Sequence, residues 1–150
     1  MAEGTRVVAH MRDGTILKGT TIDFFPNRPT FHLHPVGGGE RLEIRSAKMK
    51  ALFWVKTFDG DKGRRDVRGF LEALPETAHG RKIAVHFRDG ELLCGHSLSY
   101  LPERPGFFIF PADAGGNNLR IYVVTASALE IKAGPGADAL VQKIIAERSA

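Results

Sequence analysis

Two arginines that lie between prolines are the residues of this sequence best suited to bind an anion. Arg28 and Arg104 each occupy the third position of a Pro-x-Arg-Pro tetrapeptide. The prolines restrict the backbone, so each guanidinium would be presented from a rigid loop, and its planar fork suits phosphate or carboxylate. The alternative is a structural role, in which the arginine pairs with Asp13 or Asp89 or covers an aromatic ring.

Further basic residues are concentrated in the first part of the chain. Residues 1–58 hold nine Lys and Arg against five Asp and Glu, and the whole chain has a net charge of +4. Arg41 and Arg45 alternate with an acidic residue along one face of an expected strand, and Lys48 and Lys50 follow. Such a face could bind the phosphates of nucleic acid, and the alternative is an ordinary solvated strand surface. The candidate phosphate-binding residues are therefore Arg28, Arg104, Arg41, Arg45, Lys48 and Lys50.

The sequence shows no combination of residues that would support catalysis or hold a metal. His32 and His34 would share one face of a strand, but the aligned residues later in the chain are Phe108 and Phe110. No cysteine or carboxylate cluster completes a ligand set. The single cysteine, Cys94, has no neighbouring base motif, and no serine carries a nucleophile signature. We therefore expect a protein that is not an enzyme and has no metal or other cofactor.

The composition is that of a soluble globular protein. The 150 residues are 43% hydrophobic and 25% charged. No apolar run approaches the roughly 20 residues that cross a bilayer, and the first residues contain no apolar signal segment. One cysteine cannot form an internal disulfide, which suits a reducing compartment. We expect a cytoplasmic protein without a membrane partner, and the sequence pI of about 9.5 allows an anionic partner without requiring one.

The candidate residues are carried by two similar halves of the chain. Residues 7–35 and 83–111 align at an offset of 76 with 11 identities in 29 positions. After one extra residue in the second half, the alignment pairs Leu42–Ile44 with Leu119–Ile121 and Ala51–Leu52 with Ala128–Leu129. We name residues 5–58 copy one and residues 81–133 copy two, and we predict that each copy is one small β module.

Each copy has the pattern of five short strands. Apolar residues alternate at period two in the first strand, and the Asp-Gly that follows is typical of a tight hairpin. A glycine inside the long second strand, Gly19 or Gly95, predicts a bend or a close backbone approach. The segment Phe107–Phe110 is apolar on both faces and should be covered on both sides. The expected strands are 7–11, 16–25, 31–34, 42–45 and 51–57 in copy one, and 83–87, 92–101, 107–110, 119–124 and 128–132 in copy two.

Two segments outside the copies have helical spacing of apolar residues. One lies between Val67 and Leu74, inside a polar linker, and predicts a short helix there. The other runs from Leu140 to Ile145 and forms one apolar stripe that should dock on a module. The predicted organisation is a first module at 1–58, a linker at 59–80, a second module at 81–133 and a C-terminal helix at 134–150.

The order of these motifs resembles the Sm/LSm family, to which the bacterial host-factor RNA chaperone belongs. The matching residues are Asp13-Gly14, Gly19 and Phe24-Phe25 in copy one, and Asp89-Gly90, Gly95 and Tyr100-Leu101 in copy two. The chain is also similar to uncharacterised bacterial proteins that carry the pattern DGxxxxG…PxRPxFxLxP in tandem, which brings no known activity. These resemblances imply an all-β protein with minor helices: two tandem five-stranded Sm-like or SH3-like barrels, a linker helix and a C-terminal helix.

Three functions follow as hypotheses. The first is non-enzymatic binding of nucleic acid, above all RNA, or of another polyanion, through the basic face of copy one and the two Pro-x-Arg-Pro loops. The second is a protein-interaction or scaffold module that assembles through edge strands, for example as a homodimer. The third is sensing of a small nucleotide ligand held by Arg28 or Arg104.

Overall fold

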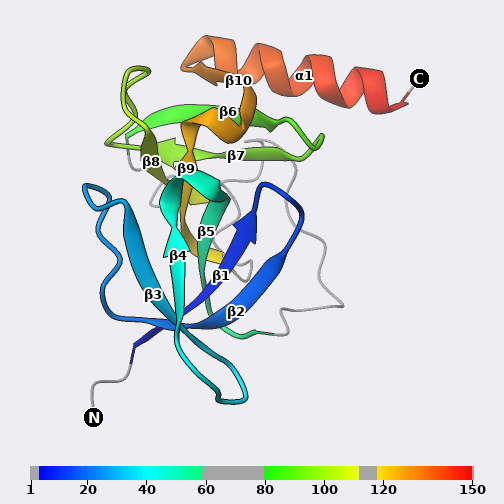
Figure 1. Cartoon of the computed structure of the whole chain (residues 1–150). Coiled ribbons are helices and arrows are strands. Elements are labelled where there is room, and N and C mark those ends of the chain that lie inside the picture. The colour runs from blue at the N-terminus through cyan, green and yellow to red at the C-terminus, as the bar shows by residue number, and fades with distance from the viewer. Residues whose placement is uncertain (1–3, 59–79, 112–117, 150) are drawn as a thin grey trace.

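The chain folds into a β-rich structure that ends in one helix (Figure 1). The computed structural model describes residues 4–58, 80–111 and 118–149, and the linker helix predicted between Val67 and Leu74 lies outside them. Copy one contains β1 (Thr5–Met11), β2 (Ile16–Thr21), β3 (Thr30–Pro35), β4 (Leu42–Arg45), the 3-10 turn η1 (Ser46–Lys48) and β5 (Met49–Val55). Copy two contains β6 (Arg81–Phe87), β7 (Leu92–Ser97), β8 (Gly106–Pro111), β9 (Asn118–Val124), the 3-10 turn η3 (Thr125–Ser127) and β10 (Ala128–Ala133). The helix α1 spans Pro135–Ser149.

The ten described strands form one antiparallel sheet in the order β10-β6-β7-β8-β9-β5-β1-β2-β3-β4. Each copy contributes five neighbouring strands, and β5 of copy one pairs with β9 of copy two. The prediction of a mainly β protein with a C-terminal helix is confirmed. The structure does not show two separate five-stranded barrels, because the β5–β9 ladder joins both blocks into a single open sheet. Patterns within one copy cannot reveal a strand pair between copies.

The two blocks of strands have the same internal registers. Val7 lies opposite Trp54 in β1 and β5, and the equivalent Ile83 lies opposite Ala133 in β6 and β10. Equivalent residues are therefore 76 positions apart in the first three strands (83 − 7) and 79 apart in the last two (133 − 54). The copies differ by three residues after the third strand, so our alignment with one extra residue is wrong by two. Strand patterns repeat every two residues, so a slip of two keeps the same faces aligned.

Aspartate and glycine shape the first hairpin of each copy in the same way. Gly14 and Gly90 have φ values of 95° and 97°, which a residue with a Cβ rarely adopts. The carboxylate of Asp13 accepts a hydrogen bond of 2.9 Å from the backbone N–H of Thr15. Asp89 accepts the equivalent bond from Glu91 at 3.0 Å. The predicted Asp-Gly turns are therefore confirmed, and this bond explains why both copies carry aspartate.

Close backbone approach explains the glycine in each second strand. A Cβ at Gly19 would overlap the carbonyl oxygen of His34, and a Cβ at Gly95 would overlap that of Phe110. The prediction from these two glycines is confirmed, since the second strand crosses the third without room for a side chain.

The second strands are shorter than predicted, because β2 ends at Thr21 and β7 at Ser97. At these ends a hydroxyl takes over the bond to the third strand. Thr21 Oγ1 donates to the carbonyl of His32 at 2.9 Å, and Ser97 Oγ donates to that of Phe108 at 2.5 Å. The apolar residues that follow, which suggested a longer strand, belong to the loop.

Two hydrophobic clusters each combine side chains from both copies. The larger is built mainly from copy two and includes Val8, Phe53 and two further residues of β5 from copy one. The other is built mainly from copy one and includes Tyr122 and Val124 of β9. All seven residues of β5 are buried, because each face of this strand lies against a different cluster. The strand Gly106–Pro111 also contributes to both clusters, so its predicted covering on both sides is confirmed.

The C-terminal helix α1 packs on the outer face of copy two (Figure 1). Its buried residues Leu140, Val141 and Ile144 lie against Ala84 of β6 and against Leu92 and Cys94 of β7. The predicted apolar stripe is therefore confirmed. The helix begins after Gly134, whose φ of 62° turns the chain, and Asp138 in its first turn lies 3.5 Å from Lys82.

Candidate polyanion-binding surface

Two adjoining loops bring several basic residues to one end of copy one. The backbone N–H of Ser46 in η1 donates to the carbonyl of Pro29 at 2.9 Å, and this bond joins η1 to the Pro-x-Arg-Pro loop. Arg28 precedes that proline, Arg45 precedes η1 and Lys48 is the last residue of η1, and all three side chains are exposed. We call Arg28, Arg45 and Lys48 the basic end of copy one.

Arg12 is a further basic residue at this end, and it is not among the site residues predicted from the sequence. Its guanidinium reaches the carbonyl of Ala47 in η1 at 3.5 Å, and the equivalent Arg88 donates to the carbonyl of Ala126 in η3 at 3.2 Å. The identity of Arg12 and Arg88 in the two copies was the signal that could have found them. Each arginine holds the 3-10 turn of its own copy against the first hairpin, and both side chains are exposed at the protein surface.

The two arginines of the Pro-x-Arg-Pro loops have different surroundings. The guanidinium of Arg28 lies 4.8 Å from the ring centre of Phe25, which is the ring-covering alternative considered from the sequence. Copy two has Leu101 at the position of Phe25, so Arg104 has no equivalent ring below it. Both arginines are exposed, and stacking leaves the edge of the Arg28 guanidinium able to donate to an anion.

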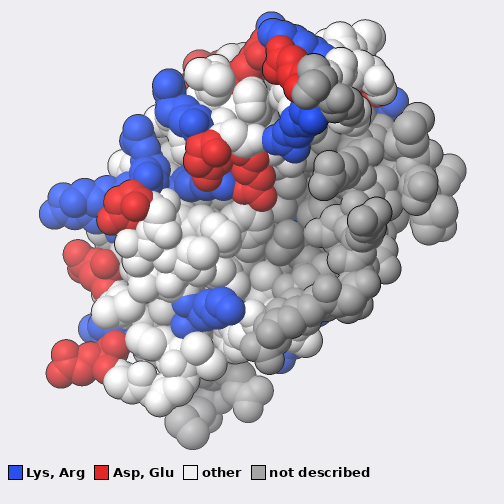
Figure 2. Space-filling view, turned by 90° about the vertical axis from the view of Figure 1, so that its right-hand side faces the viewer, with Lys and Arg blue, Asp and Glu red and all other residues white. Residues whose placement is uncertain are grey.

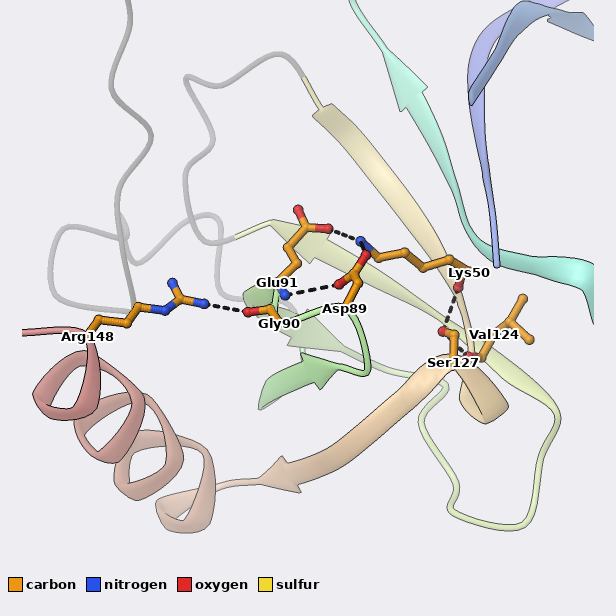
Figure 3. Close-up of polar contacts among 7 residues, drawn as sticks. All are labelled: Lys50, Asp89, Gly90, Glu91, Val124, Ser127 and Arg148. Carbon is orange, nitrogen blue, oxygen red and sulfur yellow. Dashed lines mark hydrogen bonds and ion pairs between the residues drawn. The ribbon is translucent and has the colours of Figure 1, made fainter. Parts of the chain in front are cut away.

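Lys50 does not belong to the exposed basic surface, contrary to the sequence-based expectation. Its side chain is 10% exposed, and its ammonium lies 2.7 Å from Asp89 Oδ2 and also bonds Glu91 (Figure 3). Burial alone would lower the pKa of Lys50, but the bonds to the two carboxylates outweigh it and raise the pKa. The same bonds lower the pKa of Asp89 although partial burial opposes this. Lys50 therefore links the two copies, and its charge is already paired with carboxylates and is not presented to a phosphate.

The hairpin turn that Lys50 holds is fixed from the other side as well. Arg148 of α1 donates to the carbonyl of Gly90 at 2.5 Å (Figure 3). Ser127 Oγ in η3 lies 2.9 Å from the carbonyl of Lys50 and 2.7 Å from that of Val124. The Asp-Gly turn of copy two thus connects copy one, η3 and the C-terminal helix.

His10 lies beside this link and is partly buried at the joint between the copies. Its ring centre is 4.5 Å from that of Phe53. Burial lowers the pKa of His10, while the nearby Glu91 acts in the opposite direction. His10 therefore lies at the interface between the two copies.

The outer face of β3 and β4 in copy one is polar. His32 Nδ1 lies 2.6 Å from Asp23 Oδ2, and His32 Nε2 lies 4.0 Å from Glu43 Oε2. Partial burial would raise the pKa of Asp23, but hydrogen bonds with His32 and Thr21 lower it. Arg41 and Arg45 are exposed next to this face, so cations and carboxylates alternate along it.

The equivalent face of copy two is aromatic and packs against copy one. Phe108 and Tyr122 occupy the positions of His32 and Glu43, and they pack with Phe24 and Trp54 of copy one at centroid distances of 5.0 to 6.4 Å. The guanidinium of Arg120, the equivalent of Arg41, lies 4.4 Å from the Trp54 ring centre. Both arginines are exposed, but only Arg120 lies over the aromatic rings of the joint.

Charges of both signs are distributed over the surface around the β2 side of the sheet. Figure 2 shows that basic and acidic side chains are interspersed on this face, with apolar and neutral surface between them. The cationic character predicted for copy one is therefore local, and it is best represented by Arg28, Arg45 and Lys48 with the neighbouring Arg41.

Across residues 4–58, 80–111 and 118–149, no group of three or more His, Cys, Asp or Glu side chains is arranged to hold a metal ion. In the same ranges, no helix combines the length and the apolar character needed to cross a membrane.

The fold and these surfaces define an antiparallel β protein with two structurally related halves, a shared core and an exposed cluster of basic residues. The chain belongs to the family described as a family of unknown function, DUF6982, whose model matches residues 3–133. The matched region includes both copies and ends just before α1. No curated protein and no solved structure matches the chain.

Proposed function

We propose that this protein is a non-enzymatic binding module for polyanions, with single-stranded RNA as the preferred class of ligand. The contacts would be made by the basic end of copy one together with Arg41, and by Arg104 on copy two. The observation that carries the proposal is the difference between the copies. Copy one presents Arg41 and Arg45 as two exposed cations, whereas in copy two Arg120 lies over the Trp54 ring and the position of Arg45 is taken by the buried, apolar Val124.

Sequence-tolerant phosphate binding suits this arrangement. Arg28, Arg45 and Lys48 lie around one loop and one turn, and no acidic residue lies between them in that turn. Phe25 is 46% exposed beside Arg28, and an exposed ring next to a cation is the combination on which bases stack in single-stranded complexes. Glu43 and Asp23 weaken the positive potential along β3 and β4, so contacts would concentrate at the end of the module.

The finer description of the fold belongs to the same proposal. We interpret each copy as an Sm-like or SH3-like module, and the support is the equality of the registers in all paired strands of the two copies. The Sm-like resemblance favours RNA over other polyanions, in a cytoplasmic setting.

Fluorescence anisotropy with labelled single-stranded RNA and DNA of equal length tests this proposal. We expect binding at low ionic strength that weakens as salt rises, with a slope of about 0.7 per phosphate contact for single strands. The variant Arg45→Gln with Lys48→Gln should bind more weakly and with a smaller slope. The matched control, Lys132→Gln with Lys143→Gln, removes the same charge from copy two and α1.

Three outcomes would count against the proposal. Absence of salt-dependent binding at low ionic strength contradicts any polyanion function. Equal loss in the two double variants would mean that net charge alone attracts the probe. Competition by a mononucleotide as effective as competition by the unlabelled RNA would instead support the small-ligand hypothesis for Arg28 and Arg104.

A second candidate function, a protein-interaction module, is favoured by one duplicated feature. Ile22 and Leu98 occupy equivalent positions after the second strand and are 61% and 79% exposed. Phe25 and Leu101 are a second exposed apolar pair at equivalent positions. Retention of apolar side chains at both places suits contact with another protein. Substitution of Ile22 and Leu98 by serine would test whether an assembly seen by light scattering depends on them.

A further inference from the structure

One face of copy one is covered by the neighbouring copy. Val8 on β1 and Ala51, Phe53 and Val55 on β5 point away from the core of copy one, and all four are buried. They lie in the cluster formed by copy two, and the adjoining β5–β9 ladder sets Phe53 opposite Ile121. A module of this protein therefore has a docking face on its first and fifth strands, and the occupant of that face is another module.

The equivalent face of copy two is covered by α1. Ala84 on β6 stands at the position of Val8, and it is fully buried beneath Leu140, Val141 and Ile144 of the helix. β10, the equivalent of β5, pairs only with β6 within the described chain, and it contacts α1 as well. The helix thus lies where a third module would have to sit if the arrangement of the first two were repeated.

We propose that α1 is a built-in cap that closes a docking face for copy one of a second chain, and that displacing the helix opens this face. The internal joint predicts how the two chains would pair. The residues equivalent to the β5–β9 register place Ile44 and Leu42 of the second chain opposite Glu130 and Lys132 of β10. Terminal modules of repeated structures commonly need such a cap, since an uncovered apolar face or strand edge promotes association.

The same equivalence predicts that this joint is weaker than the internal one. Where Ala51 and Phe53 fill the joint within the chain, copy two has Glu130 and Lys132, which lie 3.7 Å apart as an ion pair. The second chain would have to bury its β4, where the charged Glu43 and Arg45 stand at the positions of Tyr122 and Val124 in the internal joint. The native chain should therefore remain monomeric while α1 is docked.

A helix-displacing variant in the full chain tests the proposal. Val141→Glu with Ile144→Glu places two charges against Ala84 and should release α1. The single cysteine, Cys94, packs against the helix, so its reaction rate with a thiol reagent reports release directly. We expect a severalfold faster reaction, and a mass by light scattering that rises with concentration from 16.4 kDa to at least twice that value.

The matched control is Gln142→Glu with Ala146→Glu, which adds the same charge on the exposed side of α1. It should leave both the Cys94 reaction rate and the monomer mass unchanged. Should the helix-displacing variant prove unfolded by circular dichroism, a chain ending at Gly134 provides the same exposed face without buried charges. A monomer at all concentrations with a reactive Cys94, in either form, would overturn the proposal. So would an assembled native chain whose Cys94 is protected.

A charge exchange distinguishes the predicted pairing from unspecific adhesion. Leu42 is 37% exposed on β4, and Leu42→Lys would place a lysine opposite Lys132 of the other chain. Like charges directly opposite each other destabilise strand pairs, so this change should return the helix-displaced variant to a monomer. Adding Lys132→Glu makes the facing charges opposite and should restore assembly. Association that persists with Leu42→Lys, or is not restored, would rule out this interface.

Discussion

The outer faces of β3 and β4 in copy one and of β8 and β9 in copy two share one backbone register but have opposite surroundings. His32 and Glu43 lie in a polar, partly solvated face, whereas their equivalents are packed against copy one, Phe108 on Trp54 and Tyr122 on Phe24. Gly106 contributes to the difference, because a Cβ there would overlap the Tyr122 hydroxyl. The comparison teaches that the register of a module determines which residues share a face, while its neighbour determines whether that face must be apolar.

Substitution at one equivalent pair should show the largest difference between the two faces. Tyr122→Ala removes a ring that is 4% exposed and contacts Phe24 and Phe108, and we expect a loss of about 3–5 kcal/mol in the free energy of unfolding. Glu43→Ala, at the equivalent exposed position, should change it by less than about 0.5 kcal/mol. Urea unfolding followed by tryptophan fluorescence measures both, because Trp54 lies at the joint. Similar losses for the two variants would mean that the joint contributes no more than the solvated face.

Most of the strand architecture could be predicted from the sequence because each strand has local signals. The Asp-Gly turns, the glycine of each second strand and the alternation of apolar residues all depend on contacts within one copy. The apolar stripe of α1 was equally informative, since helical spacing identifies its buried face directly.

The joint between the copies could not be predicted, because no local signal specifies which strands of different copies pair. The continuous burial of β5 did leave a trace in the sequence, since Ala51–Val55 is apolar on both faces, as is Phe107–Phe110. Lys50 was misassigned for the same reason. It lies at an outward position of copy one, and only the neighbouring Asp89 and Glu91 make that position an internal ion pair.

Lys50 provides the next largest contrast, because its equivalent in copy two is Leu129, which is exposed. Lys50→Leu removes the cation that Asp89 and Glu91 share, and we expect a loss of about 1–3 kcal/mol, moderated by solvent around the two carboxylates. The pKa of Asp89 is lowered in the folded protein. Its ion pair therefore stabilises the fold at pH values above 3.8, the ordinary pKa of aspartate. That contribution is lost as the pH falls through the folded pKa.

The raised pKa of Lys50 sets the opposite limit. The stabilisation by the Lys50 ion pair is complete at pH values below 10.5, the ordinary pKa of lysine. It is lost as the pH rises through the pKa of Lys50 in the folded protein. The difference in unfolding free energy between the native chain and Lys50→Leu should thus be constant near neutral pH and shrink at both extremes. Thermal unfolding across the pH range measures this, and a difference that does not shrink in acid would show that packing, and not the ion pair, is responsible. Lys48→Leu, on the exposed surface, is the control.

The smallest contrast concerns the last residue of each 3-10 turn, Ser127 in η3 and its equivalent Lys48 in η1. Ser127 is buried, and its hydroxyl donates a hydrogen bond to the carbonyl of Lys50 in the other copy. Ser127→Ala should cost about 0.5–1.5 kcal/mol, the net value of one hydrogen bond, whereas Lys48→Ala should be nearly neutral for folding. Only Lys48→Ala should weaken RNA binding in the anisotropy experiment. A reversal of these two results, with Ser127 affecting binding and Lys48 affecting stability, would contradict the division between an internal joint and an exposed basic end.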